Sequence, residues 1–203
     1  MRDTISRVPT APINSAASVR RILTALGTRL ASEPETQDIV VAGGSALLAM
    51  GLVERATQDV DVVALVGDGG LLTAEQLPDA LQHAAAAVAR DLDLASDWLN
   101  SGPAELLRWG LPAGVEDRWQ TETFGEHLTV RWISRLDQIH LKLYAAVDRG
   151  GKHVRDLEAL QPIDDELLPA ARWARTHDPS EGFLEVLVEA LAYFGVNGAG
   201  LRD

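Results

Sequence analysis

Two glycines, a serine and two aspartates between residues 43 and 61 form the most informative pattern in the sequence, because they could bind a phosphate and a metal ion. The apolar run 39–42 ends in Gly43-Gly44-Ser45, and Asp59-Val60-Asp61 opens a second apolar run. Side chains on a β-strand alternate between its two faces. Asp59 and Asp61 are therefore expected to point the same way, roughly 7 Å apart, with Val60 in the core. Two such carboxylates can jointly hold a hard cation such as Mg²⁺.

The Gly-Gly-Ser part of the pattern suits a phosphate group. Glycine lets the backbone approach a phosphate closely, and a helix beginning at Ser45 would offer free N–H groups to an anion. A phosphate-binding turn beside two metal-binding carboxylates is the combination that an enzyme needs to transfer a nucleotide. The plainer alternative is a glycine turn followed by a strand whose acids merely face solvent.

A small mixed sheet accompanied by many helices is expected to position these residues. Strands are expected at 39–42, 59–66, 119–124 and 128–133, the last two as a hairpin. Helices are expected at 14–31, 45–50, 73–91, 96–100, 103–109, 135–149, 152–160, 164–175 and 180–194. Residues 1–13 are expected to be irregular. The sequence thus predicts an α+β fold, with the core and an N-terminal helix in 1–133 and a helical part in 134–203 that completes the site.

A basic stripe is expected on the helix at 135–149, beside its apolar face. At about 100° per residue, the stripe and the residues after it comprise Arg135, Gln138, Lys142, Arg149, Lys152, His153 and Arg155. Such a stripe suits a triphosphate or an RNA backbone, and its alternative is a solvated face with intrahelical pairs. Residues 128–156 carry six basic and three acidic side chains, a local charge of +3. Because the net charge of the chain is −12, the other residues together carry −15.

Composition excludes several classes of site. The 203 residues contain no cysteine, which rules out disulfides, thiol catalysis and cysteine-bound metals. The five histidines lack zinc-ligand spacing, and neither a P-loop nor a Gly-x-Ser-x-Gly pattern is present. No apolar stretch approaches the ~18 residues of a membrane span. We therefore expect a cytoplasmic protein without a membrane partner.

The motif Gly43-Gly44-Ser45 … Arg55-x-Thr57-x-Asp59-x-Asp61 resembles that of the AbiEii and MenT nucleotidyltransferase-like toxins, in the DNA polymerase beta-type superfamily. The passage from Lys142 to Asp156 resembles the second motif of the same family. The resemblance implies that Asp59 and Asp61 hold one or two Mg²⁺ ions. It also implies that Gly43, Gly44, Ser45, Arg55, Thr57 and Lys142 bind the nucleoside triphosphate.

By the same resemblance, Lys142 and Asp156 are catalytic residues, and Asp156 is the third acid, acting as base or metal support. Asp148 is the competing candidate for the third acid. The third carboxylate of the general fold lies on a later strand, and 128–133 contains no acid. Arg135, Arg149, Lys152 and Arg155 are the expected contacts to RNA or phosphate.

The resemblance further implies a toxin of a toxin–antitoxin pair. It would transfer a nucleoside monophosphate to the 3′ acceptor end of tRNA, block translation and be restrained by a cognate antitoxin protein. One alternative is an enzyme that modifies a small molecule such as a cationic aminoglycoside, which the acidic net charge would suit. The other is a degenerate nucleotide-binding module without activity.

Overall fold

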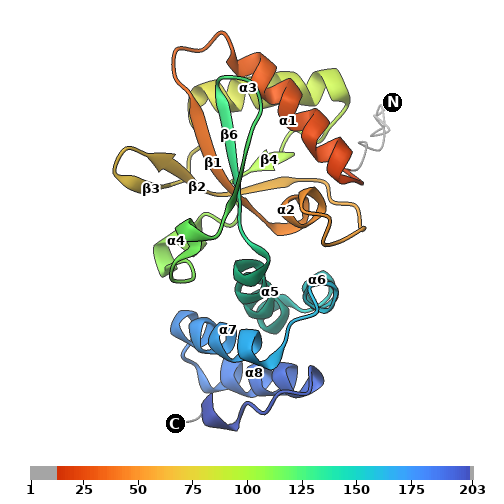
Figure 1. Ribbon diagram of the computed structural model, residues 1–203, viewed down its shortest axis with the longest axis vertical. Helices are drawn as coiled ribbons and strands as arrows, with labels where there is room; N and C mark the ends of the chain where they lie inside the picture. The colour runs from red at the N-terminus through yellow and green to blue at the C-terminus, as the bar shows by residue number, and fades with distance from the viewer. Residues whose placement is uncertain (1–12, 202–203) are drawn as a thin grey trace, which may run out of the picture.

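The computed structural model describes residues 13–201 and has an α+β fold, as predicted. The expected irregular segment 1–13 lies outside the described residues except for Ile13, which bridges to Thr57. A sheet with the N-terminal helices forms one end of the long axis, and the C-terminal helices form the other (Figure 1).

Six strands form one mixed sheet in the described part of the chain. They are β1 Gln37–Ala42, β2 Val60–Gly67, β3 Gly70–Thr73, β4 Leu99–Asn100, β5 Gln120–Thr123 and β6 Leu128–Trp132. The order is β3-β2-β1-β6-β5, and β4 pairs with β2 off this path. β1 runs antiparallel to β2 and parallel to β6. β1 and β2 are apolar runs because both of their faces are covered.

The helices divide between the two ends of the molecule. Those of the sheet part are α1 Ala16–Leu30, α2 Gly43–Ala49, α3 Asp79–Leu92 and α4 Glu105–Trp109. The C-terminal ones are α5 Arg135–Arg149, α6 Lys152–Ala159, α7 Asp164–His177 and α8 Glu181–Tyr193. Short 3₁₀ turns lie at η1 Val115–Asp117 and η2 Ala199–Leu201.

Local signals set the ends of α5 as predicted. The side chain of Ser134 accepts a hydrogen bond from the backbone N–H of Asp137, which caps the first turn. Gly150 and Gly151 both have positive φ, a conformation that ends the helix and that other residues rarely adopt. The next helix, α6, starts at Lys152, directly after these glycines, and it packs against α5 (Figure 1).

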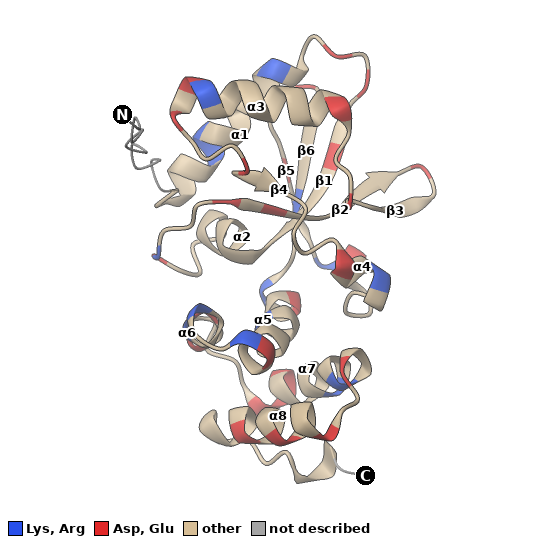
Figure 2. Cartoon of the chain, turned by 180° about the vertical axis from the view of Figure 1, so that it is seen from behind, with Lys and Arg blue, Asp and Glu red and all other residues tan. Residues whose placement is uncertain are grey.

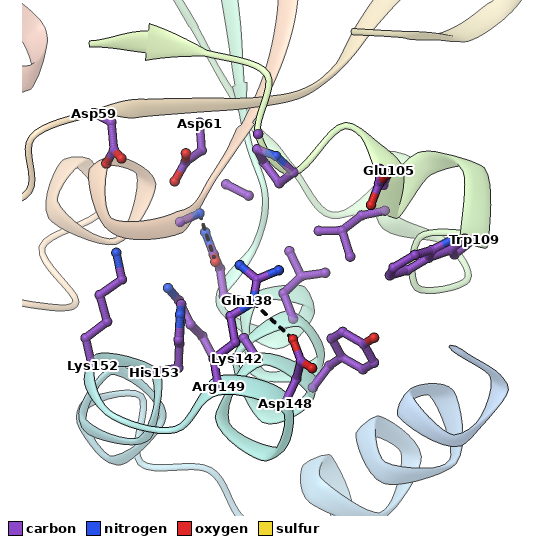
Figure 3. A pocket seen from close by; sticks show the side chains of 18 residues that line it. Asp59, Asp61, Glu105, Trp109, Gln138, Lys142, Asp148, Arg149, Lys152 and His153 are labelled. Atoms are coloured by element: carbon purple, nitrogen blue, oxygen red, sulfur yellow. Dashed lines mark hydrogen bonds and ion pairs between the residues drawn. The ribbon is translucent and has the colours of Figure 1, made fainter. Parts of the chain in front are cut away.

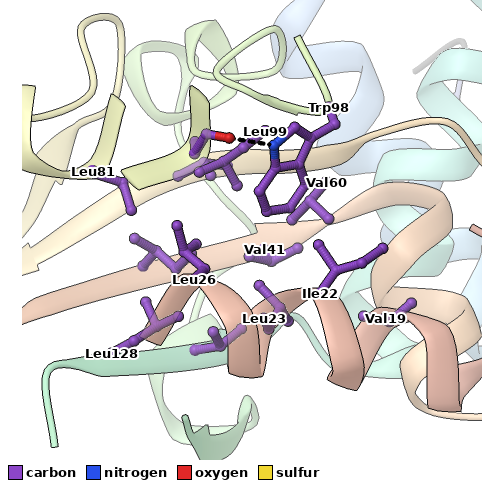
Figure 4. Packing of buried hydrophobic residues seen from close by; sticks show 14 of the residues in the cluster. Val19, Ile22, Leu23, Leu26, Val41, Val60, Leu81, Trp98, Leu99 and Leu128 are labelled. Carbon is purple, nitrogen blue, oxygen red and sulfur yellow. Dashed lines mark hydrogen bonds between the residues drawn. The ribbon is translucent and has the colours of Figure 1, made fainter. Parts of the chain in front are cut away.

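Three apolar clusters hold these elements together. The largest packs α1 and α3 on one face of the sheet and includes the fully buried Trp98, whose indole N–H donates to the Ala85 carbonyl at 3.0 Å (Figure 4). The second contains buried residues of all four C-terminal helices, α5, α6, α7 and α8, and also Leu47 of α2. The third covers the other face of the sheet with Leu141 of α5 and Val115. The sheet part and the helical part thus share apolar contacts.

Two helix predictions differ from the structure because strand pairing overrides the local pattern. The helix predicted at 73–91 starts later than expected: Gly70–Thr73 pair with β2 as a hairpin, and α3 begins only at Asp79, after Pro78. Residues 96–100 are not helical either, since Leu99 and Asn100 pair in parallel with Val60 and Asp61. β4 is therefore an added strand beside the predicted aspartates.

Candidate active site

A cavity of about 470 Å³ lies between the sheet part and helices α4, α5 and α6. Asp61 of β2 and Asp59, directly before that strand, both point into it, as predicted from the sequence (Figure 3). Lys142, Arg149, Lys152 and His153 line it from α5 and α6, and Glu105 and Trp109 line it from α4. Two polar motifs that are far apart in the sequence therefore meet at one place.

Asp61 sits tightly against the start of α2. It pairs in register with Ala42 of β1, and a Cβ added to Gly43 would lie 2.4 Å from Asp61 Oδ2. Gly43 also has φ +74°. Glycine is therefore required there because the carboxylate of Asp61 occupies the space of a side chain. Gly44 has a related role, since its missing Cβ would lie 3.0 Å from the hydroxyl of Thr57.

The predicted phosphate-binding turn is built differently from the expectation. The helix begins at Gly43, not at Ser45, and it is seven residues long. The first N–H, of Gly43, faces Gln138 Oε1 at 3.4 Å. Because the helix starts two residues early, Ser45 turns inward and is fully buried, with no hydrogen-bond partner for its Oγ. Of the Gly-Gly-Ser motif, only Gly43 lines the cavity.

The carboxylate of Asp61 is held in an environment that disfavours its charge. Burial and the neighbouring charge of Asp59 raise its pKa from 3.8 to about 6, while the side chain of Asn100, Lys142 and Lys152 oppose that rise. Asn100 lies on β4, directly opposite Asp61. A carboxylate with a raised pKa beside a second carboxylate is a place where a bound cation would relieve repulsion.

Thr57 orients the other aspartate. Its Oγ1 donates to Asp59 Oδ1 at 2.8 Å, and its backbone N–H and C=O both pair with Ile13. Thr57 is buried and does not line the cavity. It was predicted to bind nucleotide, and its observed contact is with a carboxylate that faces the cavity.

Asp156 joins Arg55 to Lys142 beneath the cavity. Its side chain is 1% exposed and accepts two hydrogen bonds from the guanidinium of Arg55, the Nη2–Oδ2 one at 2.6 Å. Lys142 Nζ lies 2.8 Å from the same Oδ2. Burial alone would raise the pKa of Asp156, but Arg55 and Lys142 outweigh it and hold that pKa below its usual range. Burial lowers the pKa of Lys142, and Asp156 counteracts it.

The two candidates for the third acid thus have different surroundings. Asp156 has both oxygens engaged by cations and does not line the cavity. Asp148 does line it, is exposed, and accepts a hydrogen bond from Arg149 Nε at 3.0 Å. A carboxylate stabilised as an anion by two cations is a poor proton acceptor, so Asp156 is suited to positioning Lys142.

The predicted basic stripe splits into two groups. Lys142, Arg149 and Lys152 reach the cavity. Arg135 does not, because it binds the Leu160 carbonyl at 2.9 Å and Glu166 at 2.6 Å and so ties α5 to the start of α7. Arg155 is exposed and lies outside the cavity lining. In Figure 2 the basic positions of α6 lie at the end of the helical part nearest α2, whereas acidic positions dominate α8.

His153 lines the cavity as a neutral side chain. Burial, together with the charges of Lys142 and Lys152, lowers its pKa to about 4. At neutral pH it therefore adds a hydrogen-bonding group and no charge. The histidine of α5, His140, bonds its own helix through the Leu136 carbonyl at 2.9 Å and packs edge-to-face on Trp173.

Sequence reasoning missed a second wall of the cavity. It contains Glu105 and Trp109, four residues apart on α4, and Tyr144 of α5. The available signal was the i, i+4 spacing of an acid and an aromatic on a predicted short helix, which places both on one face. Asn100 was also missed, because residues 96–100 were predicted to be helical.

Neither a family model, nor a curated protein, nor a solved structure matches the chain. Within residues 13–201, no cluster of three or more histidine, aspartate or glutamate side chains could hold a metal ion. No helix in that range combines the length and the apolar character needed to cross a bilayer.

Proposed function

We propose that the protein is a metal-dependent nucleotidyltransferase. The observation that carries the proposal is the meeting of two carboxylates, Asp59 and Asp61, with the cations Lys142, Arg149 and Lys152 in one cavity. Carboxylates bind the metal that accompanies a nucleoside triphosphate, and the cations balance its phosphates. A degenerate fold would have no need to keep two carboxylates and three cations facing one cavity.

Mg²⁺ fits the donor set. In sites for phosphate chemistry this ion is bound by one or two carboxylates and by substrate phosphates, not by a complete cage of protein ligands. Two carboxylates without a third acidic or histidine ligand are the set available among the described residues. Asp59 and Asp61 would hold the ion, which when bound would neutralise charge on the reacting phosphate.

The side chains around the cavity would position the metal-binding carboxylates and balance the charge of the phosphates. Thr57 fixes the rotamer of Asp59, and Gly43 leaves room for the carboxylate of Asp61. Lys142, kept in place by Asp156, would offset charge that develops on the phosphates. The acceptor oxygen would form a bond to the α-phosphorus as the bond to the bridging oxygen breaks. Pyrophosphate would leave, and the proton of the acceptor hydroxyl would pass to solvent or to the exposed Asp148.

On the family resemblance, the proposal extends to the acceptor. A cytoplasmic toxin would modify the 3′ end of tRNA, and a cognate antitoxin would restrain it. Arg155 lies exposed on α6 beside the cavity cations and would suit an RNA backbone there. A small cationic acceptor is the second candidate. It is favoured by Glu105 and Asp148, two acids that line the same cavity.

Transfer can be tested with nucleoside triphosphates labelled at the α-phosphate. The protein with Mg²⁺ should transfer label to tRNA or, on the second candidate, to an aminoglycoside, with release of pyrophosphate. Asp59→Ala should abolish transfer while leaving the thermal melting curve nearly unchanged, and the exposed Asp97→Ala serves as the matched control. Undiminished transfer by Asp59→Ala would refute the mechanism. Growth arrest on expression that is lost in Asp61→Ala would favour the toxin.

A further inference from the structure

We propose that Trp109 and Glu105 form the nucleobase-binding wall of the cavity and that this wall selects guanine. The inference rests on the proposed function, because it assumes that the cavity binds a nucleoside triphosphate. The aspartates and lysines would bind the metal ion and the phosphates, and this wall would bind the base. Figure 3 shows Glu105 and Trp109 across the cavity from Asp59, Lys152 and His153.

Trp109 is held in place although the residue is 48% exposed. Tyr144 and His177 both meet it edge-to-face, with ring centroids 6.2 and 6.0 Å away. The residue after it is fixed as well, since the Gly110 carbonyl accepts from Trp173 Nε1 at 3.2 Å and lies 3.0 Å from His177 Nε2. A large aromatic ring that is both anchored and open to a cavity is a ready surface for stacking a base.

Glu105 provides the hydrogen-bonding group of the wall. It lies one helical turn before Trp109 on α4, so both side chains share a face. Glu105 makes no ion pair with any described residue, whereas Asp148, the other acid on this side, is engaged by Arg149. Leu106 and Leu141 also line the cavity and add apolar surface. A stacked base would therefore meet a single free carboxylate at its edge.

The charges of the cavity set the orientation of the nucleotide. The three cations from α5 and α6, together with the metal ion that Asp59 and Asp61 would hold, favour phosphates at their end. A carboxylate repels phosphate, so the end that contains Glu105 suits the base. An RNA acceptor strand would likewise be repelled by Glu105, which argues that this wall serves the base of the incoming nucleotide.

A carboxylate discriminates among bases because it can only accept hydrogen bonds. Guanine presents two adjacent donors, N1–H and the N2 amino group, which can both bond to one carboxylate. Adenine and cytosine place an acceptor nitrogen beside their amino donor, and uracil places carbonyl oxygens on both sides of its single donor. Each of these would bring a lone pair against Glu105, a mismatch that binding sites penalise strongly.

The inference can be tested by calorimetry with the α,β-methylene analogues of GTP, ATP, CTP and UTP in Mg²⁺. The wild type should bind the guanosine analogue about tenfold more tightly than the adenosine one, the factor that follows from hydrogen bonds to a charged group. Glu105→Gln should remove that preference, because an amide offers one donor and one acceptor. Glu126→Gln, an exposed acid in the β5–β6 turn, is the matched control.

Stacking is tested separately. Trp109→Leu should weaken all four analogues by about 5- to 150-fold, the range found for loss of one base–aromatic stack. Trp109→Phe should recover much of that loss, which a merely structural effect of the leucine would not predict. Trp119→Ala replaces a tryptophan that packs on Arg131 away from the cavity and should leave binding unchanged.

The outcomes separate the two proposals. If the wild type binds none of the analogues, the proposed function and this inference both fail. If all four bind equally and neither Glu105→Gln nor Trp109→Leu alters them, the proposed function stands and this inference is overturned. If Trp109→Leu changes only the Michaelis constant of the acceptor, the wall binds the acceptor and the assignment to the base is wrong.

Discussion

Replacing Asp61 with asparagine should make the metal-free protein more stable at neutral pH. The pKa of Asp61 in the folded chain is raised from 3.8 to about 6, first by burial and then by the charge of Asp59. Between these two pH values the folded protein keeps a proton that the unfolded chain has lost. The free energy of unfolding therefore falls as pH rises through this window, and asparagine, which cannot ionise, escapes the loss.

The size of the effect follows from the shift. Each pKa unit corresponds to about 1.36 kcal/mol, so a rise from 3.8 to about 6 costs the folded state about 3 kcal/mol above pH 6. Asparagine has nearly the same shape and can still accept a hydrogen bond from Asn100. The difference in stability between Asp61→Asn and the wild type should thus grow by about 2 kcal/mol between pH 4 and pH 7, because at pH 4 part of the change has already occurred.

Urea unfolding at several pH values, in the presence of a chelator, measures this difference. Other titrating groups, such as Asp156, are common to both proteins and cancel. Asp97→Asn, at an exposed position, is the matched control for the substitution itself. If Asp59 and Asp61 hold Mg²⁺ as proposed, adding the ion should narrow the gap between the two proteins. A difference for Asp61→Asn that is independent of pH would refute the reasoning.

Two further predictions concern residues around the cavity. Gly43→Ala should destabilise the protein by about 1–3 kcal/mol and weaken Mg²⁺ binding, because the new methyl group meets the carboxylate of Asp61. Gly51 also has a positive φ, but a Cβ added there would meet no other atom, so Gly51→Ala introduces backbone strain without a clash. Urea unfolding and metal titration of both variants therefore distinguish the effect of the clash from the effect of the strain. Lys152→Ala should weaken binding of a triphosphate analogue without changing the melting temperature. Arg135→Ala should do the reverse, and a loss of nucleotide affinity in Arg135→Ala would contradict its structural role.

Features set by local rules could be predicted from the sequence. The shared direction of Asp59 and Asp61 follows from the alternation of side chains along a strand, and it does not depend on the neighbouring strands. The limits of α5 likewise follow from Ser134 before it and Gly150-Gly151 after it. The predicted meeting of Lys142 with the aspartate pair is also seen, through a cavity that neither segment forms alone.

Features that depend on pairing between distant segments could not be predicted. Residues 99 and 100 form a strand only because β2 lies beside them, and two residues carry no periodic signal. The burial of Ser45 was missed for a related reason. A start of α2 two residues earlier rotates Ser45 by about 200° around the helix, so the predicted contact with phosphate becomes a buried hydroxyl.

The position of Asp156 explains why its role was harder to predict than that of the aspartate pair. Lys142 is 6% exposed, and a buried ammonium must be paired to remain charged. Asp156 supplies that partner from α6 and binds Arg55 from the loop before β2 with the same carboxylate. A single acid thus ties the segment that carries Asp59 and Asp61 to the helices that carry the cations. Its contribution lies in the relative position of the two halves of the cavity, which no spacing within one segment can reveal.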